Sequence, residues 1–439
     1  MTEFIDLFSG AGGFSIGFEK AGFTSIAGYD INDKALQTYE KNHKEAQSFN
    51  KDISESEPNI KDIDLVIGSP PCQGFSVASG GERDIEEARN QLVFDFVDWI
   101  AEIKPKVAVM ENVASLRNIE EGFVDLLKEE YNKAGYIVES KVLNSANYGV
   151  PQKRERFFMI ALRKDLDETP TFPKPTHTTG ENIQTRLNGD QIDSFITVES
   201  AMKGLPDVNE SGEIEVDRSV ISNNYQEFVF DSKMTYNHTA KFANDNDEFI
   251  AERIPQGKVY RSNRFSDKYV PVWEIFEDEF SPDEKKALKF LGKNRNRKEY
   301  KATDKKHPDY IPLEKLPVTK DVLEGLYEDG WLRKKSDHGG YEFCYDLNTQ
   351  SGVRPKYNRL SLDGLSGTLT THDFNPRQKL HPTETRGLSL REGARIQSFP
   401  DSFRFYGSSN DVAKQIGNAV APLLSHQLAL HIKEKEWLE

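Results

Sequence analysis

The sequence predicts an α/β protein built on a doubly wound, mainly parallel sheet, with a second, smaller domain inserted before its last segments. Short apolar runs alternate with amphipathic stretches between residues 4 and 162, as in βαβ units. A glycine-rich turn at 9–13 follows the first apolar run. From about Asp165 the alternation is lost, and Pro170–Gly180, rich in Pro and Thr, is typical of a linker that leaves the sheet.

The chain length fits this division, since 439 residues are enough for two domains with a sizeable core. We expect the sheet domain to span 1–185 and the inserted domain 186–407, with a carboxyl-terminal helix in 408–439 that returns to the sheet domain. Hydrophobic residues make up 36% and charged residues 29%, which indicates a globular protein rather than a disordered one.

Cysteine usage and charge narrow the class of protein. The two cysteines, Cys72 and Cys344, argue against a disulfide framework and favour a reducing cytoplasm. No signal peptide is expected, and no apolar run approaches the ~18 residues of a membrane span. The net charge of −15 argues against general polyanion binding, but a local basic face can act over about one Debye length, ~8–10 Å.

The first strand, Phe4–Phe8, leads into the turn Ser9–Gly13 and a helix at 14–21. Glycines at such a turn let a ligand approach the backbone and the helix amino terminus. The third glycine of the dinucleotide fingerprint is replaced by Ser15. We therefore expect a nucleoside-bearing cofactor other than a nicotinamide or flavin dinucleotide.

The second strand, Ser25–Tyr29, ends at Asp30, whose carboxylate suits ribose hydroxyls at that edge. An equally good interpretation makes Asp30 the cap of the helix at 33–42. Asp52 follows the third extended segment in the same way, with a turn aspartate as its alternative.

The fourth strand, Asp64–Ile67, leads into the segment GSPPCQGFS at Gly68–Ser76. Its two prolines stop the strand and place Cys72 on a rigid turn at the carboxyl edge, where open α/β sheets bind ligands. A lone cysteine is more often a buried hydrophobe, but this turn chemistry favours a presented thiol. The segment Val77–Arg89 has no apolar period and is predicted to form a lid.

Two further strands bring charged side chains to this edge. A helix at Leu92–Ile103 precedes the strand at 107–110, which delivers Glu111 to the edge that holds Cys72, unless Glu111 only caps the next helix. After a strand at 136–143, Arg154 and Arg156 begin the strand at 157–162, either as an ion-paired edge or as a clamp for an anion or base.

The inserted domain holds two predicted helices. Ser281–Glu284 forms a capping box for a helix that ends at Gly292, and a second helix covers 319–329. With a strand at Tyr341–Tyr345 they suit a winged-helix-like insert. The run Lys285–Lys306 carries ten Lys/Arg against two acids, as either a solvated face or a phosphate contact. Nearer the carboxyl end, Ser389–Ile396 is predicted helical, and Gln415–Pro422 is predicted to open a last helix that runs through Ile432.

Six motifs in order make the chain resemble DNA cytosine methyltransferases that modify carbon-5, of the bacterial or phage restriction-modification type. They are DLFSGAGG, GSPPCQGFS, ENV, QKRER, REGARIQSFPDSF and QIGNAVAP, covering Phe4 to about Leu162 and Arg386 to Pro422. The resemblance implies a Rossmann-like methyltransferase sheet, with the insert as target-recognition domain. It also implies S-adenosylmethionine as cofactor, double-stranded DNA as partner, no metal and a possible cognate restriction endonuclease. One catalytic module with one insert and no regulatory extension suits a monomeric bacterial or phage modification enzyme.

The resemblance assigns roles to individual residues. Asp30, shorter than the family's usual Glu, would hold the ribose, and Ile31 would pack on adenine where an aromatic can stack. The full set of implied cofactor-binding residues is Phe8, Ser9, Gly10, Ala11, Gly12, Gly13, Asp30, Ile31, Asp52, Ile53, Pro71, Leu92, Asn418 and Ala419. The implied DNA-binding residues are Gln73, Ser76, Ser79, Lys293, Arg295, Arg297 and Lys298.

The implied mechanism starts from the weak nucleophilicity of carbon-5 in neutral cytosine. The Cys72 thiolate would add at carbon-6, Glu111 would hold nitrogen-3, and Arg156, supported by Arg154, would contact the carbonyl side of the base. The base must first be flipped out, at a cost of a few kcal/mol.

Two alternatives stay open. One is a transfer-RNA cytosine methyltransferase, whose characteristic Cys-Phe-Thr is here only Cys344-Tyr345-Asp346. The other is a catalytically dead DNA-binding regulator, which would be expected to have lost Cys72, Glu111 or the glycine loop.

Overall fold

The chain forms two compact units, each described here by itself. One comprises Met1–Ala240, Leu362–His372 and Ser389–Glu439, and the other Lys241–Ser361 and Asp373–Leu388. The computed structural model describes residues 2–60, 62–71, 92–118, 122–178, 192–208, 212–243, 248, 251–260, 269–270, 274, 277–294, 297, 299–300, 310–338, 340–347 and 357–439. None of the helices within these ranges is long and apolar enough to cross a membrane.

A seven-stranded sheet of order β3-β2-β1-β4-β5-β8-β6 organises the first unit. Its first five strands are parallel, whereas β8 is antiparallel to both β5 and β6. The strands are β1 (Glu3–Leu7), β2 (Thr24–Asp30), β3 (Gln47–Asn50), β4 (Leu65–Gly68), β5 (Val107–Val113), β6 (Tyr136–Asn144) and β8 (Glu155–Arg163). The predicted α/β class is confirmed.

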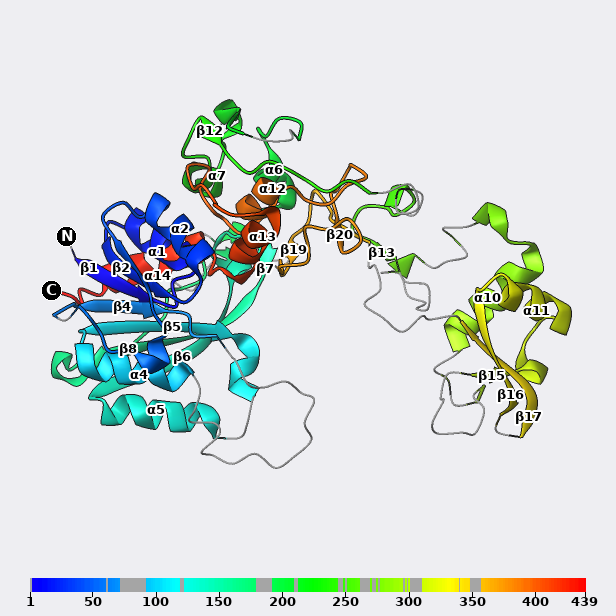
Figure 1. Ribbon diagram of the computed structural model, residues 1–439, viewed down its shortest axis with the longest axis horizontal. Coiled ribbons are helices and arrows are strands. Elements are labelled where there is room, and N and C mark those ends of the chain that lie inside the picture. The colour runs from blue at the N-terminus through cyan, green and yellow to red at the C-terminus, as the bar shows by residue number, and fades with distance from the viewer. Residues whose placement is uncertain are drawn as a thin grey trace. The chain divides into compact units, whose positions relative to one another are not determined.

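Helices cover both faces of this sheet (Figure 1). On one side lie α1 (Gly13–Lys20), α2 (Asp33–Asn42) and α14 (Pro422–Glu434), and on the other α4 (Leu92–Ile103) and α5 (Phe123–Lys133). Successive side chains of β1 point to opposite faces of the sheet, so its apolar residues pack against both layers of helices. Ile5 and Leu7 join the apolar cluster beneath α4 and α5, whereas Phe4 packs on Phe18 of α1, with 5.6 Å between ring centroids.

A buried polar network lies on the α1 side of β1. Ser15 Oγ donates to Asp6 Oδ2 at 2.6 Å and lies 3.0 Å from the Tyr39 hydroxyl, which is 2.7 Å from Ser25 Oγ. Asp6 is fully buried, and its Oδ1 has no hydrogen-bond partner among the described residues. Burial, opposed by the Ser15 hydrogen bond and assisted by the nearby Asp30 carboxylate, raises the pKa of Asp6 to about 8. Asp6 is therefore mainly protonated at neutral pH.

This pKa predicts a pH-dependent stability. Because the folded pKa of Asp6 lies above its unfolded value, the native state retains a proton that the unfolded chain releases. Stability from this group is complete below about pH 4 and is lost as pH rises toward 8, by at most about 1.4 kcal/mol per pH unit. Asp6→Asn keeps the shape without the ionisation. In urea unfolding at pH 5 and pH 8, Asp6→Asn should gain stability relative to wild type at the higher pH. A difference that does not change with pH would contradict the prediction.

The segments before and after the second unit add short elements to the first. These include α6 (Val198–Met202), β11 (Ile214–Glu215), α7 (Asn224–Val229), β12 (Met234–Thr235), α12 (Leu390–Ile396) and α13 (Ser409–Asn418). Residues 192–240 and 389–407 thus belong to the compact unit of the sheet, although the predicted inserted domain was 186–407. The functional division of the chain stays a prediction, since compactness and target recognition are different properties.

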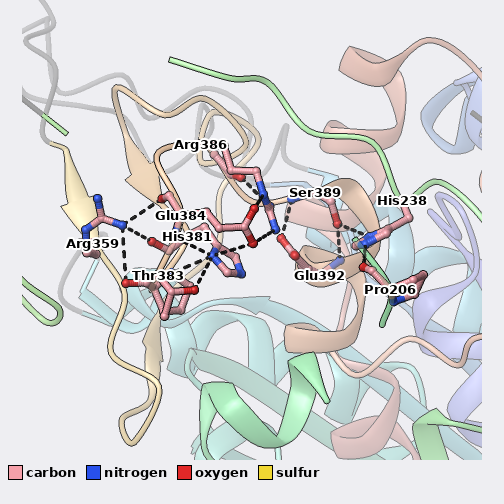
Figure 2. A network of polar contacts seen from close by, with 11 residues as sticks. Pro206, His238, Arg359, His381, Thr383, Glu384, Arg386, Ser389 and Glu392 are labelled. Carbon is pink, nitrogen blue, oxygen red and sulfur yellow. Dashed lines mark hydrogen bonds and ion pairs between the residues drawn. The ribbon is translucent and has the colours of Figure 1, made fainter. Parts of the chain in front are cut away.

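The buried side chains of α12 fix these segments. Ser389 caps α12 in a capping box with Glu392, and its Oγ lies 2.8 Å from His238 Nδ1 (Figure 2). His238 Nε2 lies 3.0 Å from the Pro206 carbonyl, so this nitrogen carries the proton and Ser389 donates to Nδ1. Both ring nitrogens of His238 and the Ser389 hydroxyl thus have hydrogen-bond partners, so this serine–histidine pair has a structural role.

The predicted last helix is wrong in one respect. Gln415 to Ile432 is not continuous: α13 ends at Asn418, and α14 begins at Pro422. Pro422 disfavours a helical conformation at the preceding residue and lacks the N–H for an internal helical bond, which makes it suited to a first turn. Gly417 and Asn418 therefore lie at the end of a helix and not near its start.

The described residues of the second unit form two small sheets. One has the order β14-β13-β18-β20, from β13 (Val259–Tyr260), β14 (Tyr269–Val270), β18 (Asn358–Arg359) and β20 (Lys379–Leu380). Arg359 is buried there and donates to the carbonyls of Ala251, Ile254 and His381, each at 2.7 Å. Figure 2 shows the contact with His381. One guanidinium thereby joins two chain segments that are more than a hundred residues apart.

The other sheet is antiparallel, with the order β15-β17-β16, from β15 (Ile311–Pro312), β16 (Leu332–His338) and β17 (Tyr341–Leu347). It packs with α10 (Pro282–Asn294) and α11 (Lys320–Glu328) around its own apolar cluster. The predicted capping box is present, because Ser281 Oγ accepts from the Glu284 N–H and Glu284 Oε2 accepts from the Ser281 N–H. Both predicted helices are confirmed, and α10 continues two residues beyond Gly292.

Candidate active site

The turn after β1 is left-handed at three positions, with φ of 59° at Phe8, 53° at Gly10 and 93° at Gly12. The Ser9 N–H donates to the Tyr29 carbonyl and the Gly12 N–H to the Ser9 carbonyl, both at 2.9 Å. A side chain at Gly10 would meet no atom within 4 Å, whereas one at Gly12 would collide with the His43 ring. The turn is therefore closed beneath Gly12 and open above Gly10, where a ligand can approach the backbone.

Asp30 is tied to this turn. Its Oδ2 accepts from the Gly10 N–H and its Oδ1 from the Asn32 N–H, both at 2.8 Å. Asn32, and not Asp30, caps α2, so the alternative role of Asp30 as that cap is not the one observed. Burial raises the pKa of Asp30, while the backbone donors oppose this shift. A carboxylate can accept about four hydrogen bonds, which leaves acceptor capacity for a diol.

The neighbouring predicted cofactor residues differ in exposure. Ile31 is 63% exposed, which is unusual for a large apolar side chain and suits packing against a flat ligand. Asp52 is exposed and accepts from both the N–H and the hydroxyl of Ser54. These are the local contacts expected if Asp52 is a turn aspartate, the alternative to a cofactor-binding role. Ile53 is buried in the core, and its carbonyl accepts from Trp99 Nε1 at 3.0 Å.

Asn112 fixes the segment that follows β4. Its side-chain amide donates to the Pro70 carbonyl at 2.8 Å, and its Oδ1 accepts from the Val113 N–H at 2.8 Å. Pro70 is buried and Pro71 is exposed. The sequence indicates Asn112 only as part of the ENV motif and predicts no role for it. Because Pro70 is two residues before Cys72, Asn112 anchors the chain that leads to the thiol.

Glu111 and Arg156 form an ion pair, with 3.0 Å between Glu111 Oε1 and Arg156 Nε. Glu111 lies in β5 with 6% of its surface exposed, so it does not cap a helix as the alternative interpretation required. Burial raises the pKa of Glu111, and the positive charges of Arg156 and Arg154 oppose that shift. Burial is the larger of these opposing effects, so the pKa of Glu111 lies above its ordinary value.

Arg154 has a different set of partners from Arg156. It is buried and donates to the carbonyls of Leu369 (3.1 Å), Gly417 (3.0 Å) and Ala419 (3.0 Å). Burial lowers its pKa to about 9, so it stays charged at neutral pH. These bonds fix the backbone on either side of Asn418, which is itself exposed. Arg154 therefore positions the predicted cofactor residues Asn418 and Ala419 and does not share the contact that Arg156 makes with Glu111.

Ala419 also lies beside the glycine turn. Its carbonyl accepts from Gln397 Nε2 at 2.6 Å, and a side chain at Gly13 would collide with Ala419 and Val420. The structure thus brings together Phe8–Gly13, Asp30 and Ala419 in one region of the sheet unit. Leu92 begins α4 and is half-buried. These groups fit a nucleoside-bearing cofactor: an open backbone turn, an acceptor for a diol and an exposed apolar face at Ile31.

Some predicted residues are not part of this region. Cys72, Gln73, Ser76 and Ser79, with the lid at 77–89, lie outside the described residues, as do Arg295 and Lys298. Lys293 and Arg297 are exposed residues of the second unit. Where the structure describes side chains, no three His, Cys, Asp or Glu come together as metal ligands.

The strand order 3-2-1-4-5, the ligand-accessible turn after β1 and the charged groups at the carboxyl edge are typical of α/β enzymes that use a nucleoside-type cofactor. Comparison with known proteins gives the family. A family model described as C-5 cytosine-specific DNA methylase matches residues 2–434, and the chain belongs to this family. The predicted family and enzyme class, a DNA cytosine-5 methyltransferase, are thereby confirmed.

Individual relatives cover nearly the whole chain. Type II methyltransferase M.AgeI of Thalassovita gelatinovora is 31% identical, over 98% of each chain. Type II methyltransferase M.DdeI of Desulfomicrobium norvegicum is 30% identical, over 98% of this chain and 88% of the relative. A crystal structure provisionally described as a DNA modification methyltransferase from an E. coli prophage aligns over 99% of both chains, with a TM-score of 0.63 and 19% identity, and supports the fold alone.

Proposed function

We propose that this enzyme methylates a cytosine flipped out of double-stranded DNA, through a covalent adduct between carbon-6 and the Cys72 thiol. S-adenosylmethionine would supply the methyl group from its sulfonium. The Phe8–Gly13 turn, Asp30, Ile31 and Asn418 would hold this cofactor, with Asp30 accepting from its hydroxyls. Cys72, Glu111 and Arg156 would act on the base.

The electron flow follows from the chemistry of the ring. The Cys72 thiolate forms a bond to carbon-6 while nitrogen-3 takes a proton from Glu111, which leaves an enamine with a nucleophilic carbon-5. Carbon-5 would then take the methyl group as the bond between that methyl and the sulfonium sulfur breaks, and the sulfur would leave as a neutral thioether. A base removes the hydrogen on carbon-5, the sulfur–carbon bond breaks, and the nitrogen-3 proton returns to Glu111. The raised pKa of Glu111 supports this role, because it favours the carboxyl form that donates.

One observation carries the proposal: Asn112 anchors Pro70 while the adjacent residue, Glu111, is paired with Arg156. The proton donor and the segment that leads to Cys72 are therefore fixed by consecutive residues of one strand. Convergence of the segment that leads to Cys72 and a buried carboxyl with a raised pKa on one edge favours catalysis over a structural role.

The proposal extends to the partners. The insert would recognise the target site, with the lysines and arginines of 293–298 facing DNA and Gln73, Ser76 and Ser79 near the flipped base. The enzyme would act as a monomer in the cytoplasm of a bacterium, encoded by the bacterium or by a phage. A cognate restriction endonuclease would accompany it.

The test uses DNA duplexes in which 5-fluorocytosine replaces cytosine, incubated with protein and S-adenosylmethionine. Fluorine cannot leave as a proton does, so we expect a denaturation-resistant protein–DNA complex whose peptide map locates the bond at Cys72. A bond at another residue would contradict the assigned nucleophile. Absence of a complex on every duplex, with methyl transfer to transfer RNA instead, would favour the RNA alternative. Absence of cofactor binding would favour a dead regulator.

A further inference from the structure

The segment 282–347 has the arrangement of a winged-helix module. Helix α10 is followed by β15, a short turn of 3-10 helix at Leu313–Lys315, then α11 and the hairpin β16–β17. In the sheet, β17 lies between β15 and β16, with both pairs antiparallel. Leu288, Leu291, Leu323 and Leu326 from the two helices pack on this sheet in one apolar cluster.

Helix α11 has the place of a recognition helix, since it directly precedes the hairpin. Its surface is unsuited to a nucleic acid, however. Asp321 and Glu328 are exposed, and Asp329 follows at the carboxyl end. Lys334 of the hairpin is neutralised by Glu324 of α11, with 2.7 Å between the charged atoms. Apart from Lys320 at its first position, the exposed charged residues of α11 are acidic, and phosphates would repel them, which argues against α11 as the helix that faces a duplex.

Helix α10 presents the opposite charge. Lys286, Lys289 and Lys293 are exposed, and at 3.6 residues per turn they lie within about 60° of one another. Ala287, Leu288 and Leu291 are buried on the opposite side. None of these three lysines makes an ion pair or hydrogen bond within the described part of the chain. We call Lys286, Lys289 and Lys293 the α10 ridge.

We infer that the α10 ridge, and not α11, contacts the phosphate backbone of duplex DNA. The module supports this partner by its charge, because 282–347 contains fifteen Lys/Arg and thirteen Asp/Glu in a chain whose net charge is −15. The rest of the chain is therefore more acidic than the whole, whereas these three cations share one exposed helix face and have no ion-pair partner among the described residues. The inference rests on the proposed function. It adds which helix of the module faces DNA, and it adds Lys286 and Lys289 as DNA-binding residues.

The test compares two triple variants of the full chain that remove the same charge. In the first, Lys286, Lys289 and Lys293 become Gln. In the matched control, Lys315, Lys320 and Lys335 become Gln; these lie in the same module but not on α10, and each is within 6 Å of an aromatic ring centroid. Binding to a labelled 30-base-pair duplex of mixed sequence is measured by fluorescence anisotropy across a KCl series, with circular dichroism to verify folding.

Each phosphate contact contributes about 0.9 to the slope of log affinity against log salt. We expect the slope of the ridge variant to be shallower than that of wild type by about 2–3, and its affinity at low salt to be weaker by roughly tenfold or more. The control should keep the wild-type slope. An unchanged slope in the ridge variant, equal losses in both variants or a loss confined to the control would each overturn the inference. Methyl transfer by wild type is recorded in parallel: its presence with an unchanged slope rejects only the inference, and its absence rejects the proposed function.

Discussion

Replacing Cys72 by alanine is expected to reduce methyl transfer to the uncatalysed background while leaving the binding of cofactor and DNA within a few-fold of wild type. Without the thiolate, carbon-6 has no covalent partner, and carbon-5 remains too weak a nucleophile to take a methyl group from a sulfonium. The measurement is single-turnover transfer of labelled methyl groups to duplex DNA, together with calorimetric binding of S-adenosylmethionine. The 5-fluorocytosine complex should also disappear.

The chain provides a matched control in its other cysteine. Cys344 is fully buried in β17, and burial raises the pKa of its thiol to about 11, so it is inert at neutral pH. Cys344→Ala should retain both methyl transfer and the trapped complex, apart from a modest loss of stability from the cavity. Retained methyl transfer in Cys72→Ala would reject the covalent mechanism. A loss of cofactor and DNA binding equal to the loss of activity would instead assign Cys72 a structural role.

Glu111→Gln is expected to lower the single-turnover rate by roughly 10²–10⁴, the usual contribution of a positioned acid or base. Glutamine keeps the size of the side chain but cannot transfer a proton to nitrogen-3. Formation of the 5-fluorocytosine complex should slow by a similar factor, because the proton is needed as the thiolate adds. Cofactor affinity should change little, since the residues proposed to bind it do not include Glu111.

Glu155→Gln is the matched control for this variant. Glu155 is exposed at the start of β8, one residue before Arg156, and in the described structure only its backbone carbonyl contacts that arginine. The control should keep the wild-type rate, whereas equal losses in both variants would indicate a general effect of charge near Arg156. A rate in Glu111→Gln within threefold of wild type would reject Glu111 as the proton donor.

The sequence by itself determined the class of fold and the candidate edge. Strand periodicity, the glycine turn, the prolines before Cys72 and the capping box at Ser281 are local signals, carried by residues within a few positions of one another. Because parallel strands place their carboxyl ends at one edge, the approach of Glu111 to the segment that leads to Cys72 also followed from strand order. The motif order gave the family, which the comparisons confirm.

Only the tertiary structure showed which side chains hold the backbone of the candidate site in place. Arg154 was expected beside Arg156 at the base, but it donates to the carbonyls of Gly417 and Ala419, more than 260 residues away. Asn112 reaches Pro70 across 42 residues. Asp6 is fully buried and forms no ion pair with the residues that the structure describes. Backbone carbonyls carry no sequence signal, and burial depends on every element packed around a residue, so these assignments required the folded chain.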